Sequence, residues 1–396
     1  MITIAHVWLD YLPNTFVEPH PYLVKEGRYG SIILAANVYD NGSAADSCTY
    51  YYRKKPLTGL HAPSRTVRII NRILRPLNWH FSGRFISNKI QEKKPSLIHI
   101  HFGTTAANLL RVMKQNQIPT VVSFYGVDAS AGFLDRRSLA KYRELFQLAD
   151  RFIVLCETVK ERFLVHGCPP EKVIVWNMPA GVEKFPYQER RTPKVADDAV
   201  RFITAARFVE KKGHVFLLHA FEKLIRQGKK ATLSLIGYGP LLPLLETRIR
   251  ELGLSGLVRI EDTNLKPNFA DHYSELLKSH DIFVLPSTTA RSGDDEGGPA
   301  LTLVCAQAAG LPVICTPFPG SEITVSDGSS GLFCRENDAD SLCERMMYLM
   351  ERPELWNHMG ARGHALAMDQ FAERTQMEQM CEIYEDLLDE KETRRQ

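Results

Sequence analysis

The residues best placed for chemistry lie in the second half of the chain, beyond an apolar segment. Glu296 is followed by two glycines, which let the backbone approach a ligand closely, and by Pro299, which suits the first turn of a helix. That helix is expected to run to about Ala309, where Gly310 caps it. A carboxylate and free backbone amides then meet at a helix N-terminus, beyond the carboxyl end of the predicted strand Asp281–Leu285. Such a place suits a sugar hydroxyl and a diphosphate.

Two cations follow the first predicted strand of the same half. Arg207 and Lys212 come after Val200–Ala205, so both can reach a ligand at the carboxyl end of that strand. The alternative is that they are ordinary surface cations.

Three polar residues of the first half stand at or just after predicted strand ends. His101 ends the strand Leu97–His101, and Tyr125 and Asp128 follow the strand Thr120–Phe124. Histidine can exchange protons near neutral pH, although an isolated buried histidine is more often structural. Tyrosine can donate or accept a hydrogen bond without charge. Asp128 either caps the following helix or contacts an acceptor.

Short apolar runs alternate with helical patterns along most of the chain, which predicts βαβ units and parallel sheets. A polar stretch with three prolines interrupts the pattern. We expect a first Rossmann-like domain at 1–185, a linker at 186–199, a second Rossmann-like domain at 200–370, and a C-terminal helix at 371–396 that packs back toward the first domain. The remaining predicted strands are Ile2–Val7, Ser31–Ala36, Arg151–Leu155, Lys172–Val175, Ala231–Ile236, Val258–Ile260 and Pro312–Cys315, and the predicted helices include Thr105–Asn116, Leu139–Gln147, Gly213–Gln227 and Leu241–Leu252.

Composition and cysteine spacing bound the class of protein. The 396 residues carry a formal net charge of +3, which indicates no polyanionic partner and no nucleic acid. The eight cysteines show no C-x-x-C pair, so we expect small buried thiols in a reducing compartment. Asp294 and Asp295 are adjacent carboxylates without further ligands at useful spacing, which is weak support for a metal site.

The segment from Arg53 to Lys94 has eleven Lys and Arg residues against one acidic residue, interleaved with apolar side chains. It could lie on an anionic membrane surface, or its apolar face could cover the N-terminal sheet. The N-terminus lacks a basic n-region and carries Asp10, and no apolar run reaches the roughly 18 residues of a spanning helix. We therefore expect a cytoplasmic protein, peripheral on the inner face of the cell membrane if the basic segment binds there.

These motifs together resemble glycosyltransferase family 4, a large retaining family with the GT-B fold. Its E-G-x-P…E-A-x-A-x-G-x-P-V block is similar to Glu296–Val313, and its G-x-G-P turn is similar to Gly237–Pro240. The resemblance extends over nearly the whole chain through Asn177…Phe185, Arg207…Lys212-Gly213, His99–Gly103 and Ser123–Asp128, the last two being similar to motifs of polysaccharide-assembly members.

The resemblance implies two Rossmann-like doubly wound domains facing across a cleft, and a nucleotide-sugar donor held by the second. It implies that Arg207 and Lys212 bind the diphosphate, that Glu296 orients the donor sugar, and that no metal or cofactor is needed because the two cations stabilise the leaving group. A glycan or lipid-linked hydroxyl would be the acceptor. Catalytic roles fall to Arg207, Lys212, Glu296 and His101, sugar or acceptor contacts to Tyr125 and Asp128, and donor contacts to Gly237, Gly239, Gly297, Gly298, Pro299, Ala300, Leu301 and Cys305.

Two positions depart from the family pattern. Tyr125 stands where many members have a histidine, and Cys305 stands where a second glutamate binds the ribose of the nucleotide. A thiol cannot replace a carboxylate that accepts two hydroxyl groups. The sequence therefore leaves a natural variant, a deliberate substitution and an inactive homologue open. The alternatives to a transferase are a nucleotide-sugar epimerase with the same fold and a non-catalytic partner subunit.

Overall fold

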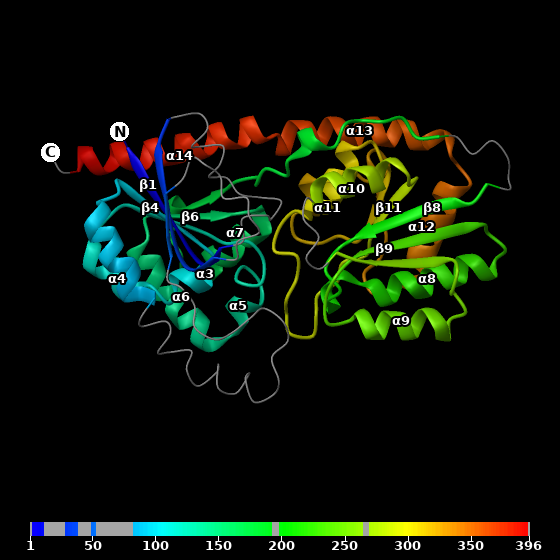
Figure 1. Ribbon diagram of the computed structural model, residues 1–396, viewed down its shortest axis with the longest axis horizontal. Helices are drawn as coiled ribbons and strands as arrows, with labels where there is room; N and C mark the ends of the chain where they lie inside the picture. The colour runs from blue at the N-terminus through cyan, green and yellow to red at the C-terminus, as the bar shows by residue number, and fades with distance from the viewer. Residues whose placement is uncertain are drawn as a thin grey trace. The chain divides into compact units, whose positions relative to one another are not determined.

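The computed structural model describes residues 2–11, 28–38, 49–52, 82–191, 198–263 and 269–394. The chain divides into two compact units. Unit 1 comprises Met1–Val154, Lys160–Trp176 and Met377–Gln396, and unit 2 comprises Leu155–Val159 and Asn177–Gln376. Each unit contains one parallel sheet with helices around it (Figure 1), which confirms the predicted α/β class with two doubly wound sheets.

The sheet of unit 1 has seven strands in the order β3-β2-β1-β4-β5-β6-β7. The strand order reverses at β1, which pairs with β2 along one edge and with β4 along its other edge. Strand β3 was not predicted, because its sequence TYYY has no aliphatic residue. The strands are β1 Thr3–Tyr11, β2 Gly30–Val38, β3 Thr49–Tyr52, β4 Leu97–His101, β5 Thr120–Ser123, β6 Arg151–Val154 and β7 Val173–Val175.

Helices of unit 1 lie around this sheet, and the predicted helix Thr105–Asn116 is two helices. The side-chain amide of Asn108 donates to the carbonyl oxygen of Thr104 at 2.7 Å, a local bond that competes with helix continuation. Helix α6 begins after Asp135, whose carboxylate accepts from the backbone N–H of Ser138 at 2.8 Å. The elements are a helix at 82–93, α3 Gly103–Ala106, α4 Leu110–Asn116, α5 Ala131–Leu134, α6 Arg136–Leu148, α7 Glu157–Val165 and α14 Glu373–Thr393.

The basic segment predicted at 53–94 lies within the described residues only from position 82. Its helix at 82–93 buries Ile86 and Ile90, and Lys89 pairs with Glu92 at 2.6 Å. These two apolar side chains are therefore buried within unit 1. Residues 53–81 lie outside the described ranges, so both interpretations of the basic segment stay predictions.

The sheet of unit 2 has six parallel strands in the order β10-β9-β8-β11-β12-β13. Helices α8, α9 and α12 lie on one face of this sheet and α10 and α11 on the other (Figure 1). The apolar stripe of α8, including Leu217, Phe221 and Leu224, packs with Phe202 and Leu233 in the core. The elements are β8 Val200–Ala205, β9 Ala231–Gly237, β10 Val258–Asp262, β11 Ile282–Leu285, β12 Val313–Cys315, β13 Gly331–Phe333, α8 His214–Arg226, α9 Leu242–Glu251, α10 Phe269–Lys278, α11 Leu301–Ala308, α12 Ala339–Met350 and α13 Glu354–Phe371.

The start of the expected linker 186–199 is bonded into unit 2. The guanidinium of Arg190 donates to the carbonyl oxygens of Leu277 at 3.0 Å and Ala309 at 2.9 Å. Arg191 pairs with the buried Asp281 at 2.9 Å. Residues 192–197 lie outside the described ranges.

A search for membrane spans covered the described residues. None of their helices combines the length and the apolar character that crossing a bilayer requires.

Candidate active site

A buried ion pair joins two of the predicted site residues in unit 2. The ammonium of Lys212 lies 2.7 Å from Oε1 and 2.6 Å from Oε2 of Glu296. Ser287, which follows β11, donates its hydroxyl to the same carboxylate. Lys212 follows β8, so the carboxyl ends of two adjacent parallel strands bring these groups together.

The protonation of Glu296 is set by its neighbours. Burial opposes its ionisation, but Lys212, Lys211 and the Ser287 hydroxyl outweigh burial and hold the pKa of Glu296 below its usual value. The group is therefore a carboxylate at neutral pH, able to accept hydrogen bonds from hydroxyl groups.

Arg207 lies between β8 and Lys212 and is exposed. The backbone around it is fixed by the neighbouring strand end, because the N–H of Phe208 donates to the carbonyl oxygen of Tyr238 at 2.7 Å. Gly237 ends β9 and Gly239 follows in the same turn. The predicted cations and the predicted glycine turn therefore occupy one end of one sheet.

Lys211 was missed by the sequence analysis and holds the loop that carries Glu296. Its buried ammonium lies 2.9 Å from a carboxylate oxygen of Asp294 and 2.6 Å from the carbonyl oxygen of Asp295. Of the two carboxylates considered as a weak metal site, that of Asp294 is thus engaged with a lysine, whereas Asp295 contacts the same lysine through its backbone carbonyl oxygen. The signal in the sequence was the doubled lysine before Gly213, which the analysis assigned to Lys212 alone.

The turn before α11 departs from the predicted helix start. Pro299 was expected in the first turn, but the helix begins at Leu301 with Ala300 as its N-cap, so the proline lies before the helix. Gly297 and Gly298 form the preceding turn, and a Cβ on Gly298 would lie 2.5 Å from Cβ of Leu155. The glycine is needed because backbone and side chain meet there.

Cys305 lies inside α11 and is completely buried. Its thiol donates to the carbonyl oxygen of Ala180 at 3.4 Å, and burial raises the pKa of the thiol well above its usual value. The side chain therefore contacts the segment before the turn Val182–Lys184 and does not reach Lys212 or Glu296 through any hydrogen bond described.

In unit 1, Asp128 ties the ends of two strands together. Its buried carboxylate accepts from the backbone N–H of Gly103 at 2.8 Å and from those of Tyr125 and Gly126 at 3.2 and 3.0 Å. Of its two predicted roles, the cap of the following helix is not seen, because that helix has Ser130 as its N-cap and Asp128 binds the first residue of α3. The predicted contact with an acceptor stays a prediction. Gly103 is needed there because a Cβ would lie 1.9 Å from the ring of Phe124.

The expected site residue His101 is buried and has a partner at each ring nitrogen. Its Nδ1 lies 2.7 Å from the hydroxyl of Tyr125, and its Nε2 lies 3.1 Å from Nδ1 of His6. The ring of Trp8 stacks on His101 with centroids 3.9 Å apart. Tyr125 is partly exposed, whereas His101 is completely buried, so of this pair the tyrosine is the residue nearer to solvent.

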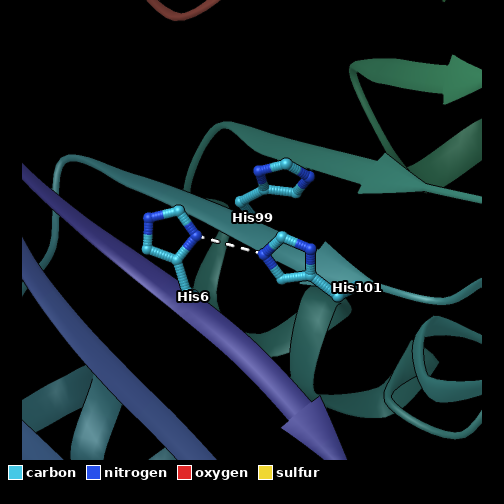
Figure 2. A group of neighbouring side chains, drawn as sticks. All are labelled: His6, His99 and His101. Atoms are coloured by element: carbon cyan, nitrogen blue, oxygen red, sulfur yellow. Dashed lines mark hydrogen bonds between the residues drawn. The ribbon is translucent and has the colours of Figure 1, made fainter. Parts of the chain in front are cut away.

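Three imidazoles gather on this face of the sheet (Figure 2). His6, His99 and His101 come from β1 and β4, and their ligand atoms lie within 4.8 Å of one another, close enough for a metal ion. His99, however, contacts the hydroxyl of Tyr384 through Nδ1 at 2.6 Å and that of Ser123 through Nε2 at 2.7 Å. Because both nitrogens of His99 are engaged, the arrangement fits a hydrogen-bonded network better than a metal centre.

Sequence reasoning missed His6, Trp8, His99 and Ser123, although the pattern contained a signal. Side chains two residues apart on a strand share a face. The pairs His6 and Trp8, His99 and His101, and Ser123 and Tyr125 each have this spacing, and the register places His6 beside His99 and His101 beside Ser123. Three such pairs on adjacent strands predict one polar and aromatic patch.

We expect the buried histidines to make the protein sensitive to acid. Burial lowers the pKa of His6 to about 3, and burial also lowers that of His99. An unfolded histidine binds a proton near pH 6.5, so stability is fully present above that pH and is lost as pH falls toward 3. For His6 alone the loss at pH 5 is about 2 kcal/mol. Urea unfolding at pH 8 and pH 5 measures it, and a His6→Asn variant should lose correspondingly less; an equal loss would contradict the assignment.

Each of the two α/β units has a doubly wound sheet of parallel strands, and cations and a carboxylate gather at the strand ends of the second unit. These are the features of GT-B glycosyltransferases. Residues 188–365 match the family model Glycosyl transferases group 1, and residues 42–182 match Glycosyltransferase Family 4. The chain belongs to the group 1, family 4 glycosyltransferases.

Relatives with similar sequences are named for polysaccharide biosynthesis. The chain is 32% identical over 250 residues to the putative colanic acid biosynthesis glycosyltransferase WcaL of Salmonella typhimurium, covering 62% of this chain and 59% of that protein. It is 31% identical over 255 residues to the amylovoran biosynthesis glycosyltransferase AmsK of Erwinia amylovora, covering 64% and 61%. The matches thus span less than two thirds of either relative's length.

Solved structures confirm the fold. Anabaena HepE, in a complex with UDP and glucose, aligns over 98% of this chain and 100% of its own with a TM-score of 0.72 and 13% identity. Sucrose-phosphate synthase of Thermosynechococcus elongatus aligns over 98% and 99% with a TM-score of 0.76 and 16% identity. At these identities the likeness concerns the fold alone.

Proposed function

We propose that the protein transfers a hexose-type sugar from a nucleotide diphosphate donor to a hydroxyl of a glycan or lipid-linked acceptor, with retention at the anomeric carbon. The observation that carries the proposal is the cluster of Lys212, Glu296 and Ser287 beside the exposed Arg207, all at strand ends of unit 2. The names of the relatives and the UDP-glucose complex of HepE support a nucleotide-sugar donor and a role in cell-surface polysaccharide synthesis.

The chemistry follows from the charges. The bond from the anomeric carbon to the phosphate oxygen breaks, the bond to the acceptor oxygen forms on the same face, and the departing phosphate takes the acceptor proton. Arg207 and Lys212 stabilise the negative charge that the diphosphate gains, which is the usual work of fixed cations at a leaving group. With two cations in this role, we propose that the reaction needs no metal ion.

The ion pair implies an exchange when the donor binds. Without donor, the ammonium of Lys212 is neutralised by Glu296. A diphosphate offers Lys212 a second anionic partner, and the carboxylate oxygens it leaves can accept hydroxyl groups of the donor sugar. The same two side chains would then divide the donor between them, phosphate to lysine and sugar to glutamate.

Unit 1 is the proposed acceptor side. Tyr125 follows β5 at the edge where ligands of parallel sheets bind, and its hydroxyl can hydrogen-bond a sugar. The basic residues 53–81 are the segment for which contact with an anionic membrane stays a prediction, and a lipid-linked acceptor would accord with it.

The function is tested by incubating the protein with UDP- and GDP-sugars, each with a glycan acceptor and with a lipid-linked acceptor. We expect one donor to give a glycoside whose anomeric configuration, measured by NMR, equals that of the donor. Inversion would refute the retaining mechanism. A sugar altered without any acceptor would show an epimerase, and calorimetry that detects no binding of UDP or GDP would favour a partner subunit.

A further inference from the structure

A continuous chain of hydrogen bonds runs across neighbouring strands on one face of the sheet of unit 1. Tyr384 of α14 contacts His99, and His99 contacts Ser123, at 2.6 and 2.7 Å. In a second arm of the network, His6 contacts His101 at 3.1 Å, and His101 contacts the hydroxyl of Tyr125 at 2.7 Å. Ser123 also hydrogen-bonds the side chain of Tyr125, which joins the two arms.

The two arms meet at the one member that is partly exposed. Tyr125 is partly exposed, whereas the other members are completely buried: His6, His99, His101, Ser123 and Tyr384. Tyr125 is therefore the member of the network that a ligand at the strand ends would touch first. Figure 2 shows His6 and His101 joined directly, with His99 beside them.

The structure assigns His6 and His101 as positioning residues that act on a bound sugar hydroxyl through the hydroxyl of Tyr125. This inference rests on the proposed transferase function and replaces the direct catalytic role expected for His101. Both nitrogens of His101 are engaged within the protein, so the imidazole has no position left for a substrate.

The tautomers explain how a buried histidine reaches the ligand. A neutral imidazole carries one N–H. When Nδ1 of His6 donates to Nε2 of His101, the proton of His101 lies on Nδ1 and is donated to the oxygen of Tyr125. The Tyr125 proton then points away from His101, toward Ser123 or toward a ligand. When His6 accepts instead, Tyr125 donates to His101 and offers a lone pair outward.

His6, acting through His101, and Ser123 on the second arm therefore together set whether Tyr125 presents a donor or an acceptor. A sugar hydroxyl can play both parts, so it can match either state, whereas the loss of Nδ1 of His6 would leave the orientation of the Tyr125 hydroxyl unspecified. Burial keeps His6 uncharged, so the network changes hydrogen-bond direction without changing charge.

The test is a double-mutant cycle between His6 and Tyr125, read in the glycosyl-transfer assay. We expect Tyr125→Phe to lower kcat/KM by about tenfold to a hundredfold, since one hydrogen bond to the substrate is lost. His6→Leu should lower it by roughly tenfold, and adding it to Tyr125→Phe should cause no further loss beyond roughly twofold, because residues in one network are not additive.

Rescue and controls separate positioning from a structural role. His6→Asn places polar atoms near the position of Nδ1 and should retain most turnover. If the leucine variant folds poorly, His6→Phe, an apolar variant closer in size to histidine, takes its place and should show the same loss of about tenfold. The matched control is His166→Asn. His166 directly follows α7, its ring nitrogen contacts the carbonyl oxygen of Arg162 and its ring lies 5.1 Å from that of Phe133, away from the network, so kcat and KM should be unchanged.

Independent losses in the double variant, or full turnover in the folded apolar His6 variants, would overturn the assignment. So would an unchanged kcat/KM in Tyr125→Phe. These results leave the proposed function intact as long as Arg207→Ala strongly reduces transfer. Normal transfer by the Arg207→Ala variant would instead contradict the proposed function itself.

Discussion

Replacing Arg207 with alanine is expected to reduce sugar transfer by about a hundredfold to a thousandfold while leaving the fold intact. The side chain is exposed and follows β8, so its removal opens no cavity, and the free energy of unfolding should change by less than about 0.5 kcal/mol. The loss should fall on kcat, because the cation stabilises charge that develops only as the diphosphate leaves.

The matched control is Arg226→Ala. Arg226 ends α8, whose other end is near the site, and its side chain is 78% exposed and paired with Glu222. Arg226 itself is mostly exposed, so its removal opens no cavity, and the unfolding measurement reports the cost of leaving the buried Glu222 without its partner. Equal activity of the two variants would show that Arg207 is not part of the active site. Steady-state kinetics with saturating donor, together with urea unfolding of each variant, provide the comparison.

Lys212 is a less direct probe of the same chemistry. Its removal leaves the Glu296 carboxylate buried without its cation, which costs folding stability as well as catalysis. A reduced rate in Lys212→Ala would therefore mix two effects, whereas Arg207→Ala reports the leaving-group interaction alone.

Introducing glutamate at Cys305 is expected to destabilise unit 2 by about 3–5 kcal/mol instead of restoring a family-type nucleotide site. Cys305 is completely buried, and its thiol donates to the carbonyl oxygen of Ala180. A carboxylate there would be buried against a carbonyl oxygen, which cannot donate to it, and the charges of Glu183 and Lys184 nearby act on it in opposite directions. Its longer side chain would also overpack the helix.

Cys305→Ser is the control, because it keeps the size and the donor at this position and should change the free energy of unfolding by about 1 kcal/mol or less. Urea unfolding measures both variants, and calorimetry with UDP and GDP measures the nucleotide site. A stable Cys305→Glu protein that binds nucleotide more tightly would show that this side chain faces the nucleotide and that the packing of α11 has been misassigned.

Much of the fold could be predicted because many of the buried strands are recognisable from their local sequence. Leu97–His101 and Val200–Ala205 were predicted with the bounds that the structure gives, since both are apolar runs buried in parallel sheets. Strand β3 could not be predicted from TYYY, and the helix predicted at Thr105–Asn116 is interrupted at Asn108, because side-chain bonds to the backbone are not visible in hydrophobic periodicity.

The sequence by itself determined which residues reach the functional edge, because parallel strands present their carboxyl ends on one side of a sheet. It thereby brought Arg207, Lys212 and Glu296 together and placed His101 and Tyr125 near each other. Only the tertiary structure decided the partners. Lys212 meets a carboxylate 84 positions away, and His99 meets a hydroxyl 285 positions away on the last helix. A local pattern records the period and polarity of one segment, whereas a buried polar group takes its partner from whichever distant segment packs against it.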